Sequence, residues 1–219
     1  MNELFRWQWV LDHLDEIQTQ GVEHLKLTFV AVGVGLLISF PLGVWAHRHK
    51  RFYLPITVVT GILYTIPSLA LFALLTPFTG LSFTTAEIGL VSYTLLILIR
   101  NIVTGLGGVP ADVREAATGM GYSANQLLWK VELPLALPVI IAGIRIATVT
   151  TIGLVTVTAL IGQGGFGYFI LLGLSRFFST ATLLGAGLSI ILAVFMDRLL
   201  IFVERRLTPW ARAVGSSAA

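Results

Sequence analysis

Long apolar runs alternate with short polar segments along most of this chain. Five of them are long enough to cross the hydrocarbon core of a membrane, which takes about 20 residues as a helix. These runs cover residues of about 22–46, 52–76, 86–103, 135–161 and 181–203. Their lengths, and their lack of strict two-residue alternation, exclude membrane β-strands. The pattern predicts an all-α membrane protein with about five transmembrane helices, which form one membrane domain over residues 22–207.

The segment before the first run, residues 1–21, has a different pattern. Its apolar side chains recur every three or four residues, so they would share one side of a helix: Leu4, Trp7, Val10, Leu11, Leu14 and Ile17. We expect an amphipathic helix in the membrane interface, with Trp7 and Trp9 near the lipid headgroups. A frayed acidic terminus is the alternative. Acidic residues stand where a signal peptide would be basic, so no cleavable signal is expected.

The basic residues predict how the chain is oriented in the membrane, because Lys and Arg are retained on the cytoplasmic side. The first connection, residues 47–51, reads His-Arg-His-Lys-Arg and is therefore expected inside. Alternation then places the amino terminus, the 77–85 loop and the 162–180 loop outside. The 104–134 loop and a cytoplasmic tail at 208–219 fall inside. Most other basic residues agree: Arg100, Arg114, Lys130, Arg198, Arg205, Arg206 and Arg212.

Composition supports a membrane protein and narrows its class. Hydrophobic residues make up 56% of the 219 residues, charged residues only 11%, and the mean hydropathy is +0.88. The pI of about 9.5 reflects basic residues at the ends of the runs, which argues against nucleic-acid binding. Small and helix-bending residues in the runs suggest close helix packing: Gly33, Gly35, Pro41, Gly61, Pro67, Gly143, Gly153, Gly185 and Gly187.

Motifs for catalysis or metal binding are weak or missing in the sequence. No phosphate-binding G-x-x-x-x-G-K-[ST] occurs, so the chain is not expected to be an ATPase itself. His47 and His49 lie in a basic loop that disfavours a metal ion. A hydrolase is not expected, because G-x-S-x-G is absent and the spans offer no plausible catalytic Asp and His. The glycines of residues 162–167 fit G-x-G-x-x-G, but they follow an apolar helix and predict a turn at the outer face.

The 104–134 connection is the most informative polar segment. Gly107-Gly108 would end the preceding span, and Pro110 suits a first helical turn. Gly119 and Gly121 would stop that first short helix. Ser123 followed by Gln126 fits a capping box, so a second short helix is expected to reach about Glu132 before Pro134 opens the next span. The segment therefore predicts a cytoplasmic helix-turn-helix.

The residues of this segment also resemble a known pattern, the EAA loop of ABC-importer permeases. The matching positions are Glu115, Ala116, Ala117, Gly119, Gly121, Val131, Leu133 and Pro134, with Val131 where Ile is usual. The resemblance implies a type I ABC importer permease fold, in which this loop is a coupling helix that docks on a cytoplasmic ATPase. ATP and Mg would be bound by that partner, and no cofactor is expected in this chain.

The resemblance extends over nearly all of residues 22–207 and is closest to permeases of the osmoprotectant subfamily, which take up glycine betaine, choline or carnitine. The stretches that carry it are His24–Thr28 with Pro41–Gly43, Tyr64–Leu71, Val131–Arg145 and Ile161–Gly167. It implies a second permease, identical or paralogous, and an extracellular substrate-binding protein. Permeases for methionine or another small amino-acid-like solute share the plan and are the alternative. A non-transport membrane scaffold is a remote alternative.

Residues for a substrate path are suggested in two places. Thr148, Thr151 and Thr158 would lie on one side of the fourth span, as a hydroxyl-lined stripe or as interhelical hydrogen-bond donors. In the second span, Tyr64 is an aromatic candidate for a quaternary ammonium group, with core packing as the alternative. The neighbouring Thr65, Pro67 and Ser68 belong to the stretch that resembles the osmoprotectant subfamily.

Overall fold

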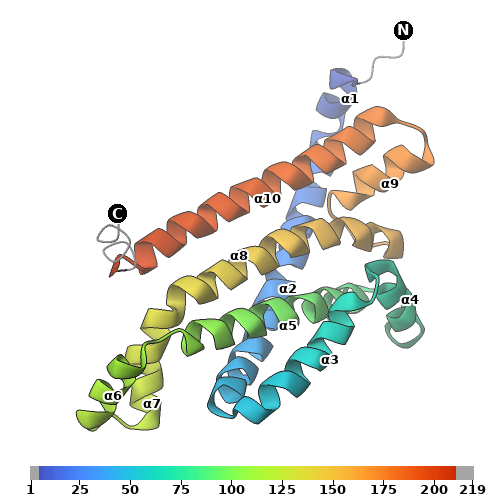
Figure 1. Ribbon diagram of the computed structural model, residues 1–219. Coiled ribbons are helices and arrows are strands. Elements are labelled where there is room, and N and C mark those ends of the chain that lie inside the picture. The colour runs from blue at the N-terminus through green and yellow to red at the C-terminus, as the bar shows by residue number, and fades with distance from the viewer. Residues whose placement is uncertain (1–4, 211–219) are drawn as a thin grey trace.

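The computed structural model describes residues 5–210, and every regular element within that range is helical (Figure 1). Among these elements η2 is a π-helix, while η1 and η3 are 3-10 helices. In chain order they are α1 (Trp7–Asp12), α2 (Leu14–Arg48), η1 (Lys50–Phe52), α3 (Tyr53–Thr65), α4 (Ser68–Thr79), α5 (Phe83–Gly107), α6 (Ala111–Gly119), α7 (Ala124–Leu127), η2 (Leu128–Glu132), α8 (Leu133–Thr158), η3 (Ala159–Ile161), α9 (Gly167–Ser175) and α10 (Ser179–Leu207).

All five predicted spans are helical, but the second one is broken. Helices α3 and α4 meet at 95°, whereas α2, α5, the continuous helix from α7 to η3, and α10 are each long and apolar enough to cross a membrane. The break lies at Ile66 and Pro67, both of which have extended backbone conformations. Proline disfavours helical geometry in the residue before it and donates no backbone hydrogen bond. The second predicted span is therefore a bent pair of helices, in line with the place of Pro67 among the helix-bending residues.

The amino-terminal segment is not a separate helix. A short α1 ends at Asp12, and α2 begins at Leu14 and continues for 35 residues into the first span. The predicted boundary near residue 21 thus falls inside α2, which runs through this position without interruption. Trp9 stacks on His13 and packs edge-on against Phe178, whereas Trp7 is exposed. Leu4 and residues 211–219 of the predicted tail lie outside the described residues.

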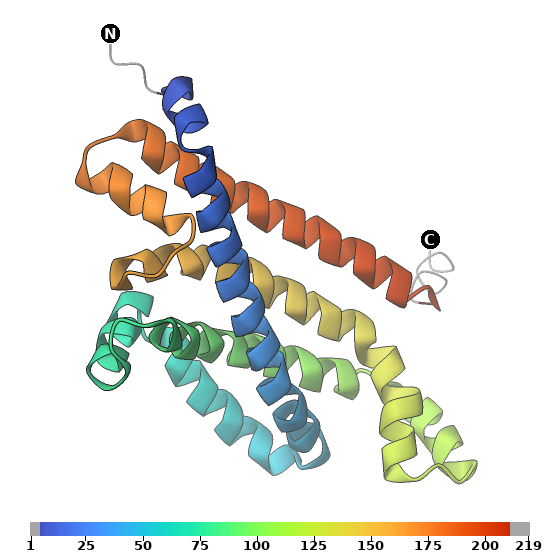
Figure 2. The same cartoon turned by 180° about the vertical axis from the view of Figure 1, so that it is seen from behind.

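Helices α2, α5 and α8 form the centre of the bundle. Helix α2 crosses the other two, as Figures 1 and 2 show from opposite sides. One apolar cluster joins these three helices to α4, and its buried members are Leu27, Ala31, Phe72, Ala86, Leu90, Val155 and Ile161. A second cluster lies between α5 and the chain from η2 into α8, around Ile102, Leu106, Leu128, Ala136 and Ile140. Helix α10 packs on α8 and α9 and is otherwise mostly exposed.

Only some of the small residues lie where helices approach each other closely. At Gly35 a methyl group would lie 1.9 Å from the Thr94 hydroxyl of α5, so no larger residue fits between α2 and α5 without a shift. Gly143 and Gly185 are in similarly close contact with neighbouring segments. The remaining glycines of the predicted set have open space around them: Gly33, Gly61, Gly153 and Gly187. Close packing therefore explains part of the glycine content of the spans.

The two ends of the bundle differ. Helices α6 and α7 and the carboxyl end of α10 lie toward one end, while α4, α9 and the start of α10 lie toward the other (Figures 1 and 2). At the second end, the glycine-rich segment after α8 forms the expected turn, with positive φ at Gly162 and Gly165. It folds back on α2, where the Gln20 side chain accepts a hydrogen bond from the Gly165 amide at 2.8 Å.

Candidate ATPase-docking loop and substrate path

The first helix of the predicted docking loop, α6, begins and ends as the sequence indicates. Pro110 was expected in the first turn of α6 and is its N-cap, one position earlier. Asp112 lies in the first turn, near the positive end of the helix dipole. At the other end the Tyr122 amide donates to the Ala117 carbonyl, and the Gly121 amide donates to Thr118. This is a Schellman ending, and it holds Gly121 at a φ of +85°.

The second half of the loop departs from the predicted short helix. The capping box is present, because Ser123 and Gln126 each accept a hydrogen bond from the other's backbone amide. Helix α7 then passes through the π-helix η2 into α8 without a break. The Leu133 amide bonds to Leu128, five residues earlier, and Pro134, which has no amide to donate, follows this π-turn within the continuous helix. The expected boundary at Pro134 is therefore absent.

A charged cluster fastens α6 to the beginning of α8. The Arg114 guanidinium lies 3.0 Å from the Glu132 carboxylate and also donates a hydrogen bond to the Leu106 carbonyl at the end of α5. His47, at the end of α2, lies 3.8 Å from the same carboxylate. Glu132 is buried, so its charge is compensated mainly by these neighbours. One carboxylate thus links three segments that are far apart in the sequence.

A second contact fixes α7. Arg48, the last residue of α2, donates one hydrogen bond to the Ala124 carbonyl and another to the Asn125 side chain at 3.1 Å. Both acceptors belong to the first turn of α7. The second half of the helix-turn-helix is thereby held against the end of α2, while Arg114 holds the first half to Glu132 and to the end of α5.

The residues of the EAA pattern divide into an exposed and an inward-facing group. Glu115, Ala116, Gly119 and Gly121 are exposed, as is the neighbouring Met120. The other members are buried or half-buried against the rest of the loop or the bundle: Ala117, Val131, Leu133 and Pro134. Leu133 packs against the second apolar cluster. The loop therefore offers a short exposed ridge on a base anchored by its inward-facing residues.

Four of the predicted substrate-path residues gather at the break between α3 and α4. Tyr64 and Thr65 end α3, Pro67 is the N-cap of α4, and Ser68 is its first residue. The Tyr64 ring lies edge-on to Tyr93 of α5 at 5.9 Å and is about 39% exposed, so it is only partly packed. Tyr93 donates its hydroxyl hydrogen bond to the Ile66 carbonyl that the break leaves free.

The three predicted threonines of α8 share one buried face, as their spacing indicated. Each hydroxyl, however, donates to a carbonyl of its own helix: Thr148 to Ile144, Thr151 to Ala147 and Thr158 to Val155. These donor bonds remain within α8, and each hydroxyl oxygen can still accept a hydrogen bond. The threonines and the residues at the α3–α4 break lie on different elements.

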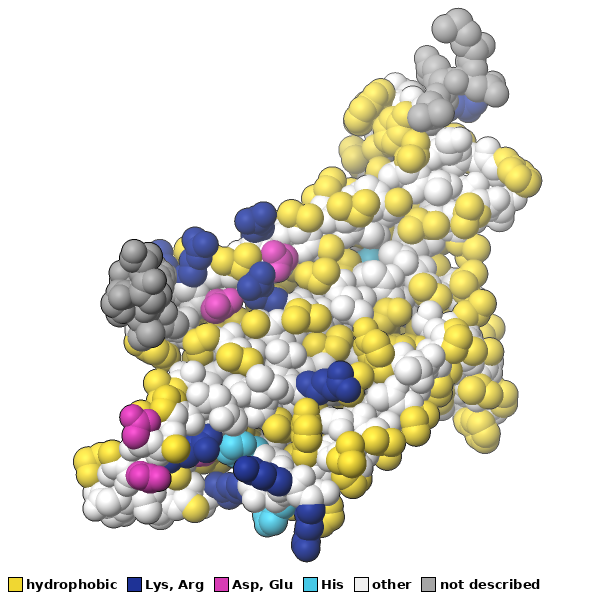
Figure 3. All heavy atoms as spheres, in the orientation of Figure 1, with side chains coloured by type: hydrophobic (Ala, Val, Ile, Leu, Met, Phe, Trp, Pro, Cys, Tyr) yellow, Lys and Arg dark blue, Asp and Glu magenta, His cyan; other side chains and the backbone are white. Residues whose placement is uncertain are grey.

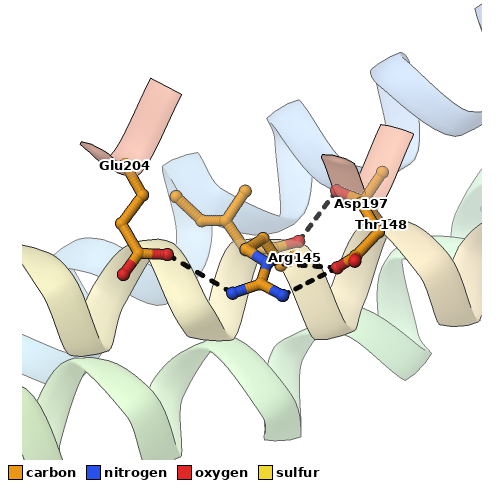
Figure 4. A network of polar contacts seen from close by, with 5 residues as sticks. Arg145, Thr148, Asp197 and Glu204 are labelled. Carbon is orange, nitrogen blue, oxygen red and sulfur yellow. Dashed lines mark hydrogen bonds and ion pairs between the residues drawn. The ribbon is translucent and has the colours of Figure 1, made fainter. Parts of the chain in front are cut away.

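A charged network between α8 and α10 was missed at the sequence level. Arg145 donates two hydrogen bonds to Asp197, at 3.1 and 2.9 Å, and one to Glu204 at 3.3 Å (Figure 4). Figure 3 shows basic and acidic side chains gathered between these two helices. The signal in the sequence was charge inside an apolar run. Asp197 also lies within the apolar run of residues 181–203, and His24 of α2 is fully buried.

Comparison with known proteins gives the family. Residues 35–209 match the family model described as the binding-protein-dependent transport system inner membrane component. The chain is 38% identical to the choline transport system permease protein OpuBB of Bacillus subtilis over 194 residues, which cover 89% of each protein. It is also 38% identical to the osmoprotectant import permease protein OsmW of Salmonella typhimurium, over 92% of this chain and 96% of that one.

Solved structures agree on the fold. An inward-facing structure of the MetNI methionine ABC transporter matches with a TM-score of 0.79 and 24% identity, over 88% of this chain and 96% of the other. An amino acid ABC transporter crystallised with histidines matches with a TM-score of 0.72 and 18% identity, over 92% and 98%. The chain belongs to the binding-protein-dependent transport system inner membrane component family and is a permease subunit of an ABC importer.

Proposed function

We propose that this permease moves an osmoprotectant or a related quaternary ammonium compound, such as glycine betaine, choline or carnitine, into the cell across the cytoplasmic membrane. The observation that carries the proposal is the identity of 38% to permeases named for choline and for osmoprotectants, over about nine-tenths of the chain. The exposed ridge on α6 supports the ATP-driven mechanism. The chain itself acts as a transporter subunit without an ATPase site.

The exposed part of the docking loop, led by Glu115 and Ala116, contacts a cytoplasmic ABC ATPase in this proposal. ATP and Mg are bound by that partner, and its closure on ATP pushes α6. The contacts of Arg114 and Arg48 then carry the displacement into α8 and α2. The buried residues of the pattern, Ala117, Val131, Leu133 and Pro134, act as the support of the ridge. Gly119 and Gly121 shape its tip.

The proposed topology has the amino terminus outside and the carboxyl terminus in the cytoplasm of a bacterial cell. Residues 1–21 are an external amphipathic segment, 22–207 form the transmembrane domain, and 208–219 are a cytoplasmic tail. Two features support this orientation: the basic residues near α6 and the end of α10, and the common end of the bundle at which these elements lie (Figure 1). Lys and Arg are retained inside.

The complete importer in this proposal contains two permease subunits, identical or paralogous, two ATPases and an external substrate-binding protein. Five spans are few to enclose a path, and α10 is largely exposed in the single chain, which supports pairing with a second permease. The binding protein selects and delivers the solute. Candidate path residues remain Tyr64, Thr65, Pro67 and Ser68 at the helix break and Thr148, Thr151 and Thr158 on α8.

A permease for methionine or another small amino-acid-like solute is the second candidate. The fold shared with MetNI favours it, although at 24% identity this likeness concerns the architecture alone. A non-transport scaffold would leave the exposed ridge of α6 without a purpose.

The decisive experiment is transport by the assembled complex in proteoliposomes, with its binding protein outside and ATP inside. We expect accumulation of labelled choline or glycine betaine, and no competition by excess methionine. Accumulation of methionine in place of either would replace the proposal with the second candidate. ATP hydrolysis without movement of any of these solutes would refute it.

A further inference from the structure

Arg145 lies at a depth in α8 where charge is expensive. Arg145 is at the middle of α8, so about 20 Å of helix separates it from either end. Its partners lie nearer the carboxyl end of α10, with Asp197 about three turns and Glu204 about one turn before Leu207. Charged side chains at such depth face a protein interior or a water-filled cavity, because hydrocarbon does not solvate them. The face of α8 and α10 that carries them is therefore turned away from lipid.

The three charged side chains are nevertheless only partly covered within this chain. The Arg145, Asp197 and Glu204 side chains remain 27%, 32% and 26% exposed, respectively. Because charged side chains are not solvated by hydrocarbon, these exposed parts must be covered by water or by a second subunit in the complex. A transport path between two permease subunits would provide both the water and the second subunit.

A groove runs along the same face between α8 and α10. Its volume is about 550 Å³, within the range of about 300–1,000 Å³ usual for small-molecule sites. Arg145, Asp197 and Arg198 are its charged lining residues, and Ile146, Val149 and Val194 are among the apolar ones. Polar groups at one place in an otherwise apolar groove would orient a solute that has both kinds of surface.

The charges of the network exceed what a simple helix clamp needs. Asp197 accepts both of its bonds on one oxygen, Oδ1, and Glu204 takes a third nitrogen of the same guanidinium. Arg145 thus faces two carboxylates, and Arg198 is a further cation on the wall of the groove. A ligand carboxylate could take the planar fork of Arg145, and the two carboxylates would then be free to face a ligand cation.

We propose that Arg145, Asp197 and Glu204 form a transient binding site for the transported solute. The site takes a small quaternary ammonium compound, with the cation toward the two carboxylates and its methyl groups toward the apolar wall of the groove. When the solute is a zwitterion, its carboxylate replaces Asp197 on Arg145. The proposal rests on the proposed function, since it names a place on that solute's path.

The test compares two solutes that differ in a carboxylate, glycine betaine and choline, in the complete complex with a saturating amount of loaded binding protein. Arg145→Gln removes the partner of that carboxylate. We expect the ratio of glycine betaine turnover to choline turnover to fall about tenfold, whereas Asp197→Asn lowers the turnover of both solutes. Arg51→Gln, the same change at the connection after α2, is the matched control and keeps the wild-type ratio.

Three outcomes separate this site from a structural role. Combining Arg145→Asp with Asp197→Arg restores the ion pair in reverse, and recovery of the wild-type ratio would show that the pair is only a clamp. Arg145→Lys keeps the positive charge but lacks the planar guanidinium, and it replaces Arg145→Gln as the test variant if that variant fails to assemble. If Arg145→Lys leaves the ratio of glycine betaine to choline turnover unchanged, the proposed site is wrong. A wild-type complex that moves neither solute instead refutes the proposed function, and the site with it.

Discussion

The Arg114 guanidinium and the Glu132 carboxylate lie 3.0 Å apart and join the predicted coupling helix α6 to the chain that enters α8. Glu132 is the last residue of the π-helix η2, an element often found at functional sites. This ion pair connects α6 by side chains to the start of the membrane-spanning helix α8. It offers a way for movement of α6 to become movement of α8.

Weakening this connection should uncouple transport from ATP hydrolysis. Glu132→Gln leaves the shape nearly unchanged but removes the charge that holds Arg114 and approaches His47. We expect solute moved per ATP hydrolysed to fall at least about fivefold while the complex still assembles. Parallel measurement of uptake and phosphate release in proteoliposomes gives the ratio. Asp112→Asn, on the exposed side of α6, is the control, and a ratio that drops equally in both would contradict this role.

Reversing the charge of the docking ridge should break the contact with the ATPase. Glu115→Lys places a cation at an exposed position that we expect to face a partner cation. Binding-protein-stimulated ATP hydrolysis should drop more than about tenfold, with membrane insertion intact. Asp12→Lys in α1 makes the same charge change on an exposed residue of the opposite end. Co-purification of the ATPase with the Glu115→Lys chain at wild-type yield would argue against docking here.

The turn after α6 should tolerate substitution of Gly119 but not of Gly121. Gly121 has a φ of +85°, which costs other residues about 1–2 kcal/mol, so Gly121→Ala should destabilise the loop and lower transport. Gly119 ends α6 in an open position, and Gly119→Ala should be neutral or stabilise by about 0.4–1 kcal/mol. Proteolysis of the loop and uptake measure the two effects. Equal behaviour of both variants would contradict the importance of the left-handed turn.

His24 should be essential for stability because two backbone groups depend on it. Its Nδ1 accepts from the Phe166 amide at 3.1 Å, so the proton is on Nε2, which donates to the Ile152 carbonyl at 3.0 Å. His24→Ala would leave both groups unpaired in a fully buried place, at a cost of about 2–4 kcal/mol.

Thermal unfolding of the purified complex in detergent measures this cost. The exposed His49→Ala is its control, because the His49 ring contacts only nearby parts of its own chain segment. A Tm for His24→Ala within a degree of the control would refute the structural role.

Local features of the docking loop followed from its residues. The capping box of Ser123 and Gln126 and the positive φ of Gly121 depend on interactions within a few positions, so their residue types were sufficient to predict them. The continuous helix through Pro134 was not predicted, because the π-turn that absorbs the proline depends on how Leu128 and Leu133 pack.

For the candidate path, the sequence predicted which threonines share a face of α8 but not where their hydroxyls point. Those of Thr148, Thr151 and Thr158 donate to carbonyls three or four residues earlier in their own helix. The Arg145 network could have been suspected from a cation within an apolar run. Its partners could not, because Asp197 and Glu204 are 52 and 59 residues away in the sequence.

The sequence by itself determined the membrane class, the five apolar runs, the short helices of the 104–134 segment and the family resemblance, since these depend on residue types and short spacings. Tertiary structure alone decided which charges meet: Arg114 with Glu132 and His47, and Arg145 with Asp197 and Glu204. The physical reason is that charge pairing across helices depends on the crossing and rotation of whole helices, which packing at places such as Gly35 and Gly143 sets.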